Sequence, residues 1–163
     1  MILVIDASAL ITLARINRLD LLPKLAKKVY IPPAVYDEVV GKGKDRPGSR
    51  EVMRATWITR RRVRDQRAVA RLRAQLGGGE AEAIVLAREL SADFVILDDA
   101  RARQIAEREG NKGLGLLGLL IRAKQRGIVE VLKPIIDEMM EAGFFIDDAL
   151  YRSILRHSGE EER

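Results

Sequence analysis

Two short apolar runs in the sequence end directly on aspartate. Residues 2–5 (I-L-V-I) lead into Asp6, and residues 94–97 (F-V-I-L) lead into Asp98 and Asp99. Continuous apolar runs of this length are typical of strands that are buried on both faces of a parallel sheet. Ligands of open parallel sheets bind at the carboxyl ends of the strands. We therefore expect the strand-end acids to meet at one edge if the two strands are neighbours.

Helical patterns separate these runs. Residues 30–33 form an extended entry to a helix, residues 57–63 predict a further strand, and Ser8 is placed to cap the first helix. Strands that alternate with helices predict an α/β fold with a parallel sheet and helices on both faces. Periodicity and capping residues predict helices over residues 7–16, 19–29, 34–40, 49–54, 65–76, 80–90, 100–109, 116–126, 134–142 and 147–156.

The length and composition indicate one domain. The chain has 163 residues, 47% of them hydrophobic, and no repeat or linker divides it. We expect a single domain over residues 1–163, with a core of about residues 1–127 and a C-terminal helical extension of about residues 128–158. The chain has no cysteine and a single histidine, so disulfides are excluded and a zinc site of thiolates or imidazoles is not expected.

The apolar N-terminus does not fit a secretory signal. No basic stretch precedes it, and Asp6 interrupts it. No apolar run is long enough to span a membrane. We therefore expect a cytoplasmic protein.

The net charge is +5, with a sequence pI near 9.7. Such an excess is compatible with a polyanionic partner, and equally with the solvated surface of a heat-adapted protein. The arginine-rich residues 60–73 allow the same two interpretations, and a solvated amphipathic face is the favoured one. Lys42, Lys44 and Arg46 are better placed than this stretch to reach a polyanionic substrate near the acids. Arg101 and Arg103 follow the acidic pair and can either neutralise it or bind a phosphate of that substrate.

Two further acids, Glu38 and Glu80, occupy helical positions that can face the same sheet edge. Each acid can also serve a simpler structural role. Asp6 can cap the first helix, Asp98 can cap the helix of residues 100–109, and Glu80 can complement a helix dipole. Together, however, several carboxylates in a partly buried cluster repel one another unless a cation joins them. Carboxylate oxygens suit Mg²⁺ or Mn²⁺, and such ions commonly serve phosphate chemistry.

The sequence resembles the PIN-domain ribonucleases. The segments that carry the resemblance are D-A-S-A-L-I, I-P-P-A-V-Y-D-E-V, G-E-A-E-A-I-V-L-A and V-I-L-D-D-A-R-A-R, followed by G-L-G-L-L-G-L-L-I-R-A-K-Q-R-G-I and G-F-F-I-D-D-A-L-Y. The most similar branch is the prokaryotic one related to VapC-like toxins, often described as a domain of unknown function. The quoted segments together span nearly the whole chain, and their order and spacing are specific to this family.

This resemblance implies a three-layer α/β/α PIN-like fold with a central parallel sheet and extra C-terminal helices. It also implies an Mg²⁺- or Mn²⁺-dependent endoribonuclease, the toxin of a toxin–antitoxin pair with a cognate antitoxin protein. Ser8 matches a small polar residue that supports the metal site, and the spacing from Glu80 favours Asp98 over Asp99. The sequence departs from the family in having Glu80 where aspartate is frequent and Leu116 where threonine is expected. The implied catalytic and metal-binding residues are Asp6, Glu38, Glu80, Asp98 and Asp99.

Two other functions remain open. A catalytically inactive PIN-like protein that binds RNA or acts as a scaffold fits the same motifs. A phosphatase with an aspartate nucleophile requires a second acid where this chain has Ser8.

The apolar residues 114–120 and the C-terminal Met139, Met140, Phe144 and Phe145 predict a homodimer. The alternative is that these side chains all pack inside the monomer.

Overall fold

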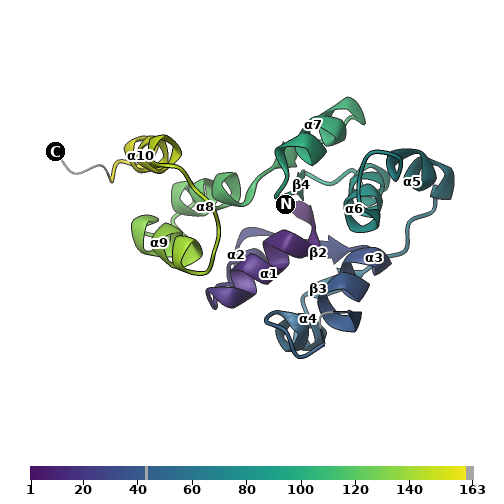
Figure 1. Ribbon diagram of the computed structural model, residues 1–163, viewed down its shortest axis with the longest axis horizontal. Coiled ribbons are helices and arrows are strands. Elements are labelled where there is room, and N and C mark those ends of the chain that lie inside the picture. The colour runs from purple at the N-terminus through teal and green to yellow at the C-terminus, as the bar shows by residue number, and fades with distance from the viewer. Residues whose placement is uncertain (43, 161–163) are drawn as a thin grey trace.

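A parallel sheet forms the centre of the molecule (Figure 1). The computed structural model describes residues 1–42 and 44–160 of the chain. Within those residues the sheet has five strands in the order β3-β2-β1-β4-β5, and every neighbouring pair is parallel. This confirms the predicted fold class. The strands are β1 (Ile2–Ile5), β2 (Lys28–Ile31), β3 (Ile58–Arg60), β4 (Phe94–Ile96) and β5 (Gly113–Leu114).

Helices cover both faces of the sheet, because successive strand side chains point to opposite sides. Leu3 and Ile5 of β1 join a core with the first group of helices, whereas Val4 joins a second core with α5, α6 and α7. The first group is α1 (Ala7–Arg15), α2 (Leu21–Leu25), α3 (Pro33–Tyr36), its π-helical continuation η1 (Asp37–Gly41), α4 (Ser49–Arg54), α8 (Leu116–Gln125), α9 (Lys133–Glu141) and α10 (Asp148–His157). The second group is α5 (Gln66–Leu72), α6 (Gly78–Glu89) and α7 (Ala100–Arg108).

The prediction of one helix over residues 19–29 was wrong. The helix α2 ends at Leu25, Ala26 is extended, and β2 begins at Lys28. Val29 faces the first core and Tyr30 faces the second, which is the alternation of a strand. The β-branched and aromatic residues of K-V-Y-I favour this strand, and pairing with β1 secures it.

The C-terminal helices share a core with the N-terminal half of the chain. Ile135, Met139 and Ile154 belong to the same apolar cluster as Leu10 of α1. In Figure 1, α8, α9 and α10 gather at the left, beside α1. Within the apolar run of residues 114–120, Leu116, Leu119 and Leu120 are buried inside the chain.

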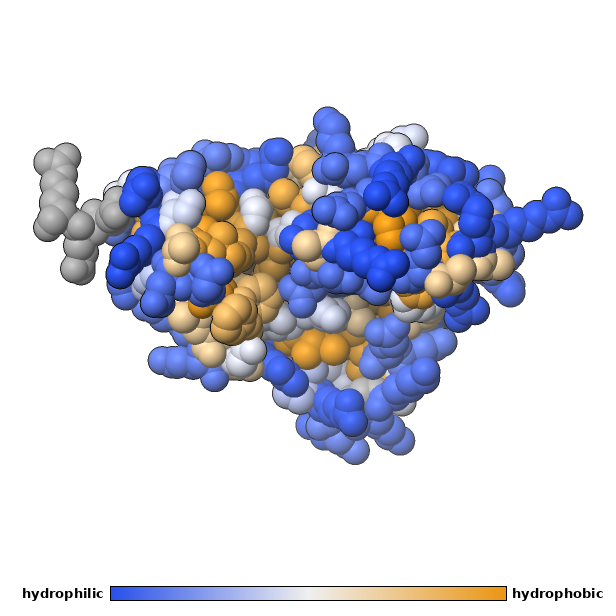
Figure 2. Space-filling view, turned by 45° about the horizontal axis from the view of Figure 1, so that its top comes forward, coloured by the Kyte–Doolittle hydropathy of each residue, from blue (hydrophilic) through white to orange (hydrophobic). Residues whose placement is uncertain are grey.

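The C-terminal part nevertheless exposes several apolar side chains. Figure 2 shows apolar residues at the surface over these helices, at the left of the view, whereas hydrophilic residues cover much of the right of the same view. The exposed residues are Val131, Met140, Phe145 and Leu150. The homodimer stays a prediction, and it now rests on this surface instead of on residues 114–120. None of the helices in residues 1–42 and 44–160 combines the length and apolar character needed to cross a bilayer.

Candidate active site

Asp6 and the acidic pair lie together at the carboxyl edge of the sheet. Ile5 of β1 pairs with Ile96 of β4, so the residues that follow both strands are neighbours. The Oδ2 atom of Asp6 accepts a hydrogen bond from the backbone N–H of Asp98 at 3.0 Å. This bond fixes the Asp6 carboxylate between the two strand ends.

Asp6 also caps helix α1. Its Oδ1 atom accepts a hydrogen bond from the backbone N–H of Ala9 at 2.9 Å, which satisfies a free donor of the first helical turn. The prediction that Ser8 caps this helix was wrong, because Asp6 occupies the cap position and Ser8 lies in the first turn, exposed to solvent. The cap role and a position at the sheet edge therefore belong to the same side chain.

The buried position of Asp6 makes its negative charge unfavourable. Only 4% of the residue is exposed, and burial is the main cause that raises the pKa of Asp6 from 3.8 to about 6. The charges of Asp98 and Glu80 raise this pKa further, while the hydrogen bonds from Ala9 and Asp98 lower it. A nearby cation would stabilise the ionised carboxylate at neutral pH.

Glu80 enters the site from the first turn of α6. Partial burial raises the pKa of Glu80, and the hydrogen bond from the backbone N–H of Gly77 at the helix cap opposes this effect. The negative charges of Asp99, Glu38 and Asp98 raise the pKa of Glu80 as well, in that order. Glu80 is therefore electrostatically coupled to acids that come from two other segments of the chain.

Glu38 lies against the start of α6, because Gly79 has no side chain. A Cβ atom at position 79 would lie 2.5 Å from Glu38 Oε1 and 3.5 Å from Val35. Glu38 itself is exposed on η1. The glycine at position 79 therefore provides the space in which the Glu38 carboxylate reaches the site.

Glu82, which the sequence did not predict as a site residue, joins α6 to α3. Its Oε2 atom accepts a hydrogen bond from the backbone N–H of Ala34 at 3.0 Å, at the start of α3. Partial burial raises the pKa of Glu82, and the Arg73 guanidinium lowers it. The motif G-E-A-E contains both acids, but only the packing of the two helices shows that Glu82 positions the segment that carries Glu38.

One pocket of about 270 Å³ unites acids from four parts of the chain. Its lining contains Asp99, whereas Asp98 lines the neighbouring pocket. Asp99 also caps α7 by accepting a hydrogen bond from the backbone N–H of Arg101 at 3.1 Å. The residues that line the acidic pocket are Asp6, Ala7, Ser8, Glu38, Gly77, Gly79, Glu80 and Asp99.

The donor atoms of this pocket are carboxylate and hydroxyl oxygens, which fit Mg²⁺ or Mn²⁺. Within the described part of the chain, no three acidic or histidine side chains lie close enough to hold one ion as they stand. Glu38 and Glu80 have long, flexible side chains. Ligation by three acids therefore requires a side chain of the pocket to rotate, and these two glutamates have the longest reach.

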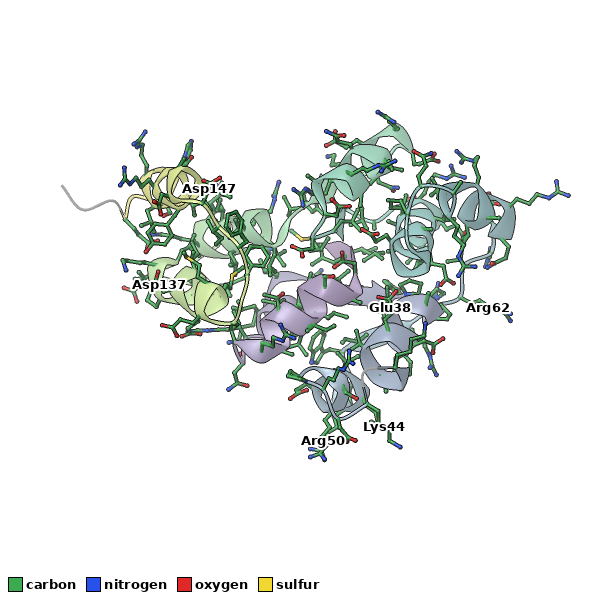
Figure 3. The ribbon with its side chains drawn as sticks, in the orientation of Figure 1. Glu38, Lys44, Arg50, Arg62, Asp137 and Asp147 are labelled. Atoms are coloured by element: carbon green, nitrogen blue, oxygen red, sulfur yellow. The ribbon has the colours of Figure 1, made fainter. Side chains whose placement is uncertain are left out.

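The predicted RNA-binding residues lie in different settings. Arg103 Nη1 donates to the carbonyl oxygens of Leu97 at 2.8 Å and Asp98 at 2.9 Å, so this arginine braces the end of β4. Arg101 is exposed beside it. Lys42, Lys44 and Arg46 are exposed on the segment after η1, and Figure 3 shows Lys44 directed away from Glu38.

Two arginines, the last residue of β3 and the one after it, lie at the same edge of the sheet as the acids. The Arg60 guanidinium lies 4.1 Å from the ring centre of Tyr36, and that of Arg61 lies 5.1 Å from the ring centre of Tyr30. Arg71, by contrast, forms two hydrogen bonds with Glu109, at 2.9 and 3.0 Å. The arginine-rich segment thus contains both stacked arginines at the site edge and a paired arginine that fixes α5.

Comparisons with known proteins agree on the kind of domain. A family model described as a PIN domain, DUF3368, matches residues 2–160. Among solved structures, the chain is similar to SSO1118, a PilT N-terminus domain protein from the hyperthermophilic archaeon Sulfolobus solfataricus P2. The TM-score is 0.53 and the identity 21%, over 76% of this chain and 93% of that chain, so this likeness concerns the fold alone. A search of curated proteins finds no match.

Proposed function

Because the chain belongs to the PIN-domain family, whose members are generally nucleases, we propose that it is a metal-dependent endoribonuclease that hydrolyses RNA phosphodiester bonds. One observation carries the proposal: four carboxylates from distant segments line a single pocket at the carboxyl edge of the sheet. Two of them, Asp6 and Glu80, have raised pKa values because burial disfavours their charge. A divalent cation in this pocket would relieve that penalty.

We assign the cation-holding role to Asp6, Glu38, Glu80 and Asp99. Asp6 is the rigid member, because two backbone N–H groups hold its oxygens. Asp99 is preferred over Asp98 because Asp99 lines the pocket and its charge raises the pKa of Glu80 more than that of Asp98 does. When bound, Mg²⁺ or Mn²⁺ would supply positive charge that stabilises the charge developing on the phosphate.

The remaining residues would place the RNA. The Ser8 hydroxyl lines the acidic pocket at the start of α1, where the helix dipole favours a phosphate oxygen. Lys42, Lys44, Arg46 and Arg101 provide exposed positive charge for the flanking phosphates. We assign Arg103 a bracing role, since its guanidinium holds two carbonyl oxygens at the end of β4.

A cleavage assay tests this proposal. We expect the wild-type chain to cut single-stranded RNA with Mn²⁺ or Mg²⁺, and Asp6→Asn to lose this activity while remaining folded. Asp93→Asn is the matched control, because the Asp93 carboxylate also accepts a hydrogen bond from a distant backbone N–H, that of Ile2 at 2.6 Å, but lies outside the acidic pocket.

The outcomes separate the two candidate functions. Unchanged cleavage by folded Asp6→Asn protein contradicts the assigned site. Tight RNA binding by the wild type without cleavage under any divalent cation would instead support the catalytically inactive RNA-binding protein.

We further propose that this activity serves as the toxin of a toxin–antitoxin pair, acting in the cytoplasm. The support is the resemblance of the motifs to VapC-like proteins, and the cognate antitoxin would be a small protein encoded next to this chain. Induced expression should arrest growth, and Asp6→Asn should abolish the arrest. Growth that continues during expression of active wild-type enzyme contradicts the toxin role and leaves the nuclease proposal intact.

A further inference from the structure

A second pocket, of about 440 Å³, adjoins the acidic pocket. Ser8 lines both pockets, and Asp98 in the second pocket directly precedes Asp99 in the first. The second pocket lies between α1 and the segment that connects α9 to α10, and its size falls in the range of small-ligand sites. A substrate strand that left the acidic pocket past Ser8 would therefore enter the second pocket next.

Helix α1 provides the polar wall of this pocket. Ser8, Thr12 and Arg15 all line it and follow one another at spacings of four and three residues, so they share one face of the helix. The Thr12 hydroxyl donates to the backbone carbonyl of Ser8 at 3.0 Å, which fixes the position of its oxygen on α1. Arg15 places an exposed guanidinium at the end farther from the acids.

The opposite wall carries an aromatic ring that the fold leaves uncovered. Phe145 is 86% exposed, whereas Phe144 packs against the core and Ile146 is buried. This alternation directs Phe145 away from the core. The segment is anchored where α9 ends, because Phe144 N–H donates to the Met139 carbonyl at 2.9 Å and Gly143 adopts a φ of +101°.

We propose that this second pocket binds an unpaired nucleobase next to the scissile phosphate. The inference rests on the proposed function and adds to that site a subsite for the base beside the cleaved bond. The base stacks on Phe145, and its polar edge faces the hydroxyls of Ser8 and Thr12. Only an unpaired base can insert in this way, because the faces of a paired base are already covered by its stacked neighbours.

The charges of the pocket fit this occupant. Asp98 presents an acceptor for the amino or imino groups of a base, and Arg15 lies beyond it, where the next phosphate of the strand would pass. An apolar peptide would leave both charges without a partner. The combination of the exposed Phe145 ring, two hydroxyls and two opposite charges therefore favours a nucleotide.

Binding measurements without divalent metal test the subsite apart from catalysis. We expect Phe145→Ala to weaken binding of a fluorescein-labelled single-stranded oligoribonucleotide in EDTA by roughly 5- to 150-fold, the range of lost base stacking. Phe145→Tyr retains an aromatic ring and should bind like wild type. Met53→Ala is the control, since Met53 is 58% exposed on α4 and does not line the pocket.

A fluorescence experiment tests stacking directly. Trp57 is the only tryptophan of the chain, so a Phe145→Trp, Trp57→Phe double variant carries its single indole in the pocket. We expect adenosine 5′-monophosphate to quench this fluorescence and ribose 5-phosphate to leave it unchanged. Equal responses to both compounds overturn the stacking role.

The outcomes also distinguish a base-binding subsite from a contact between two copies of the chain. RNA affinity that is unchanged in Phe145→Ala overturns the proposal. If that variant instead converts a dimer into a monomer in sedimentation, with RNA affinity unchanged, Phe145 is a contact between two copies.

The same measurements separate the subsite from the nuclease proposal. Loss of binding in Phe145→Ala combined with an absence of cleavage in wild type contradicts the nuclease proposal alone. Cleavage with binding independent of Phe145 contradicts the subsite alone.

Discussion

At the scale of single residues, Asp6 combines two roles that the sequence presents as alternatives. It caps α1, and it stands beside the acidic pair at the sheet edge. The two roles are compatible. The hydrogen bonds from Ala9 and Asp98 hold the carboxylate in place, and burial makes its negative charge unfavourable unless a cation is near. The choice between Asp98 and Asp99 shows what spacing alone cannot decide, since the direction of each side chain depends on how β4 turns into α7.

The raised pKa of Asp6 predicts a pH dependence of stability. Between pH 3.8 and about 6 the folded chain binds more protons at Asp6 than the unfolded chain, so its contribution to stability falls as pH rises. Below that window the penalty is absent, and above it the penalty is complete, at ~3 kcal/mol. Without metal, wild type should lose about this much stability relative to Asp6→Asn as the pH rises through this window.

Denaturant unfolding in EDTA buffers measures this difference. Subtracting the two chains removes most of the contribution of Glu80 and Asp98, which titrate in both. The asparagine amide can still cap α1, but it loses one acceptor oxygen, and this loss changes little with pH. A difference that stays constant with pH contradicts the raised pKa.

A divalent cation should reverse the penalty. Because an ion that binds only the native state stabilises it, we expect Mn²⁺ or Mg²⁺ to raise the melting temperature of wild type at neutral pH. Asp6→Asn should reduce that rise, and Asp93→Asn should keep it. The result that excludes a cation site is a wild-type melting temperature that does not respond to Mn²⁺ over the full titration.

At the scale of elements, the start of α6 organises the site. Its glycines begin the helix, leave space for Glu38 and present Glu80, while Glu82 binds the first turn of α3. The sequence predicts that a helix begins after the glycine triplet. It does not predict the contact between position 79 and Glu38, because that contact depends on the packing of helices that are distant in sequence.

Replacing Gly79 by alanine should separate stability from activity. Alanine favours the helix by about 1 kcal/mol relative to glycine. A Cβ atom there would displace the flexible end of Glu38, however, so we expect cleavage to fall while the melting temperature holds or rises.

Gly78→Ala is the matched control for this experiment. It changes the same helical turn, and its Cβ atom would lie 2.7 Å from Arg73 Nη2 instead of near an acid of the pocket. The pair is assayed for cleavage and thermal unfolding under the same conditions. Equal cleavage by both variants shows that the space at position 79 does not matter for Glu38.

At the scale of the whole molecule, the sequence predicts the arrangement of helices on both faces of a sheet, but it does not predict every strand of that sheet. The runs at residues 2–5 and 94–97 are continuous and apolar, so their strands are evident. The strand β2 follows a helical pattern without a break, and β5 has only two residues, so pairing with a neighbour defines both. The apolar run at residues 114–120 is also ambiguous, because side chains buried inside the chain and side chains buried in a dimer interface are both apolar.

The oligomeric state is the prediction that belongs to this scale. We expect a homodimer through the exposed surface of the C-terminal part, with Val131, Met140 and Leu150 at its centre. Sedimentation at micromolar concentration should give twice the chain mass, and Leu150→Glu should give the monomer. A monomer mass for wild type contradicts this prediction and leaves the site unaffected.

The strand order also sets when the acidic pocket can exist. Asp6 and Glu38 are made early, but β1 acquires its neighbour β4 only when the chain has reached residue 96. Asp99 comes later still, and its helix must fold on the assembled sheet. During synthesis from the N-terminus, a nascent chain that ends just before residue 96 holds three of the four acids, Asp6, Glu38 and Glu80, but no complete pocket. A ribosome would therefore synthesise most of this chain before the messenger RNA that it is translating could be exposed to an assembled acidic pocket.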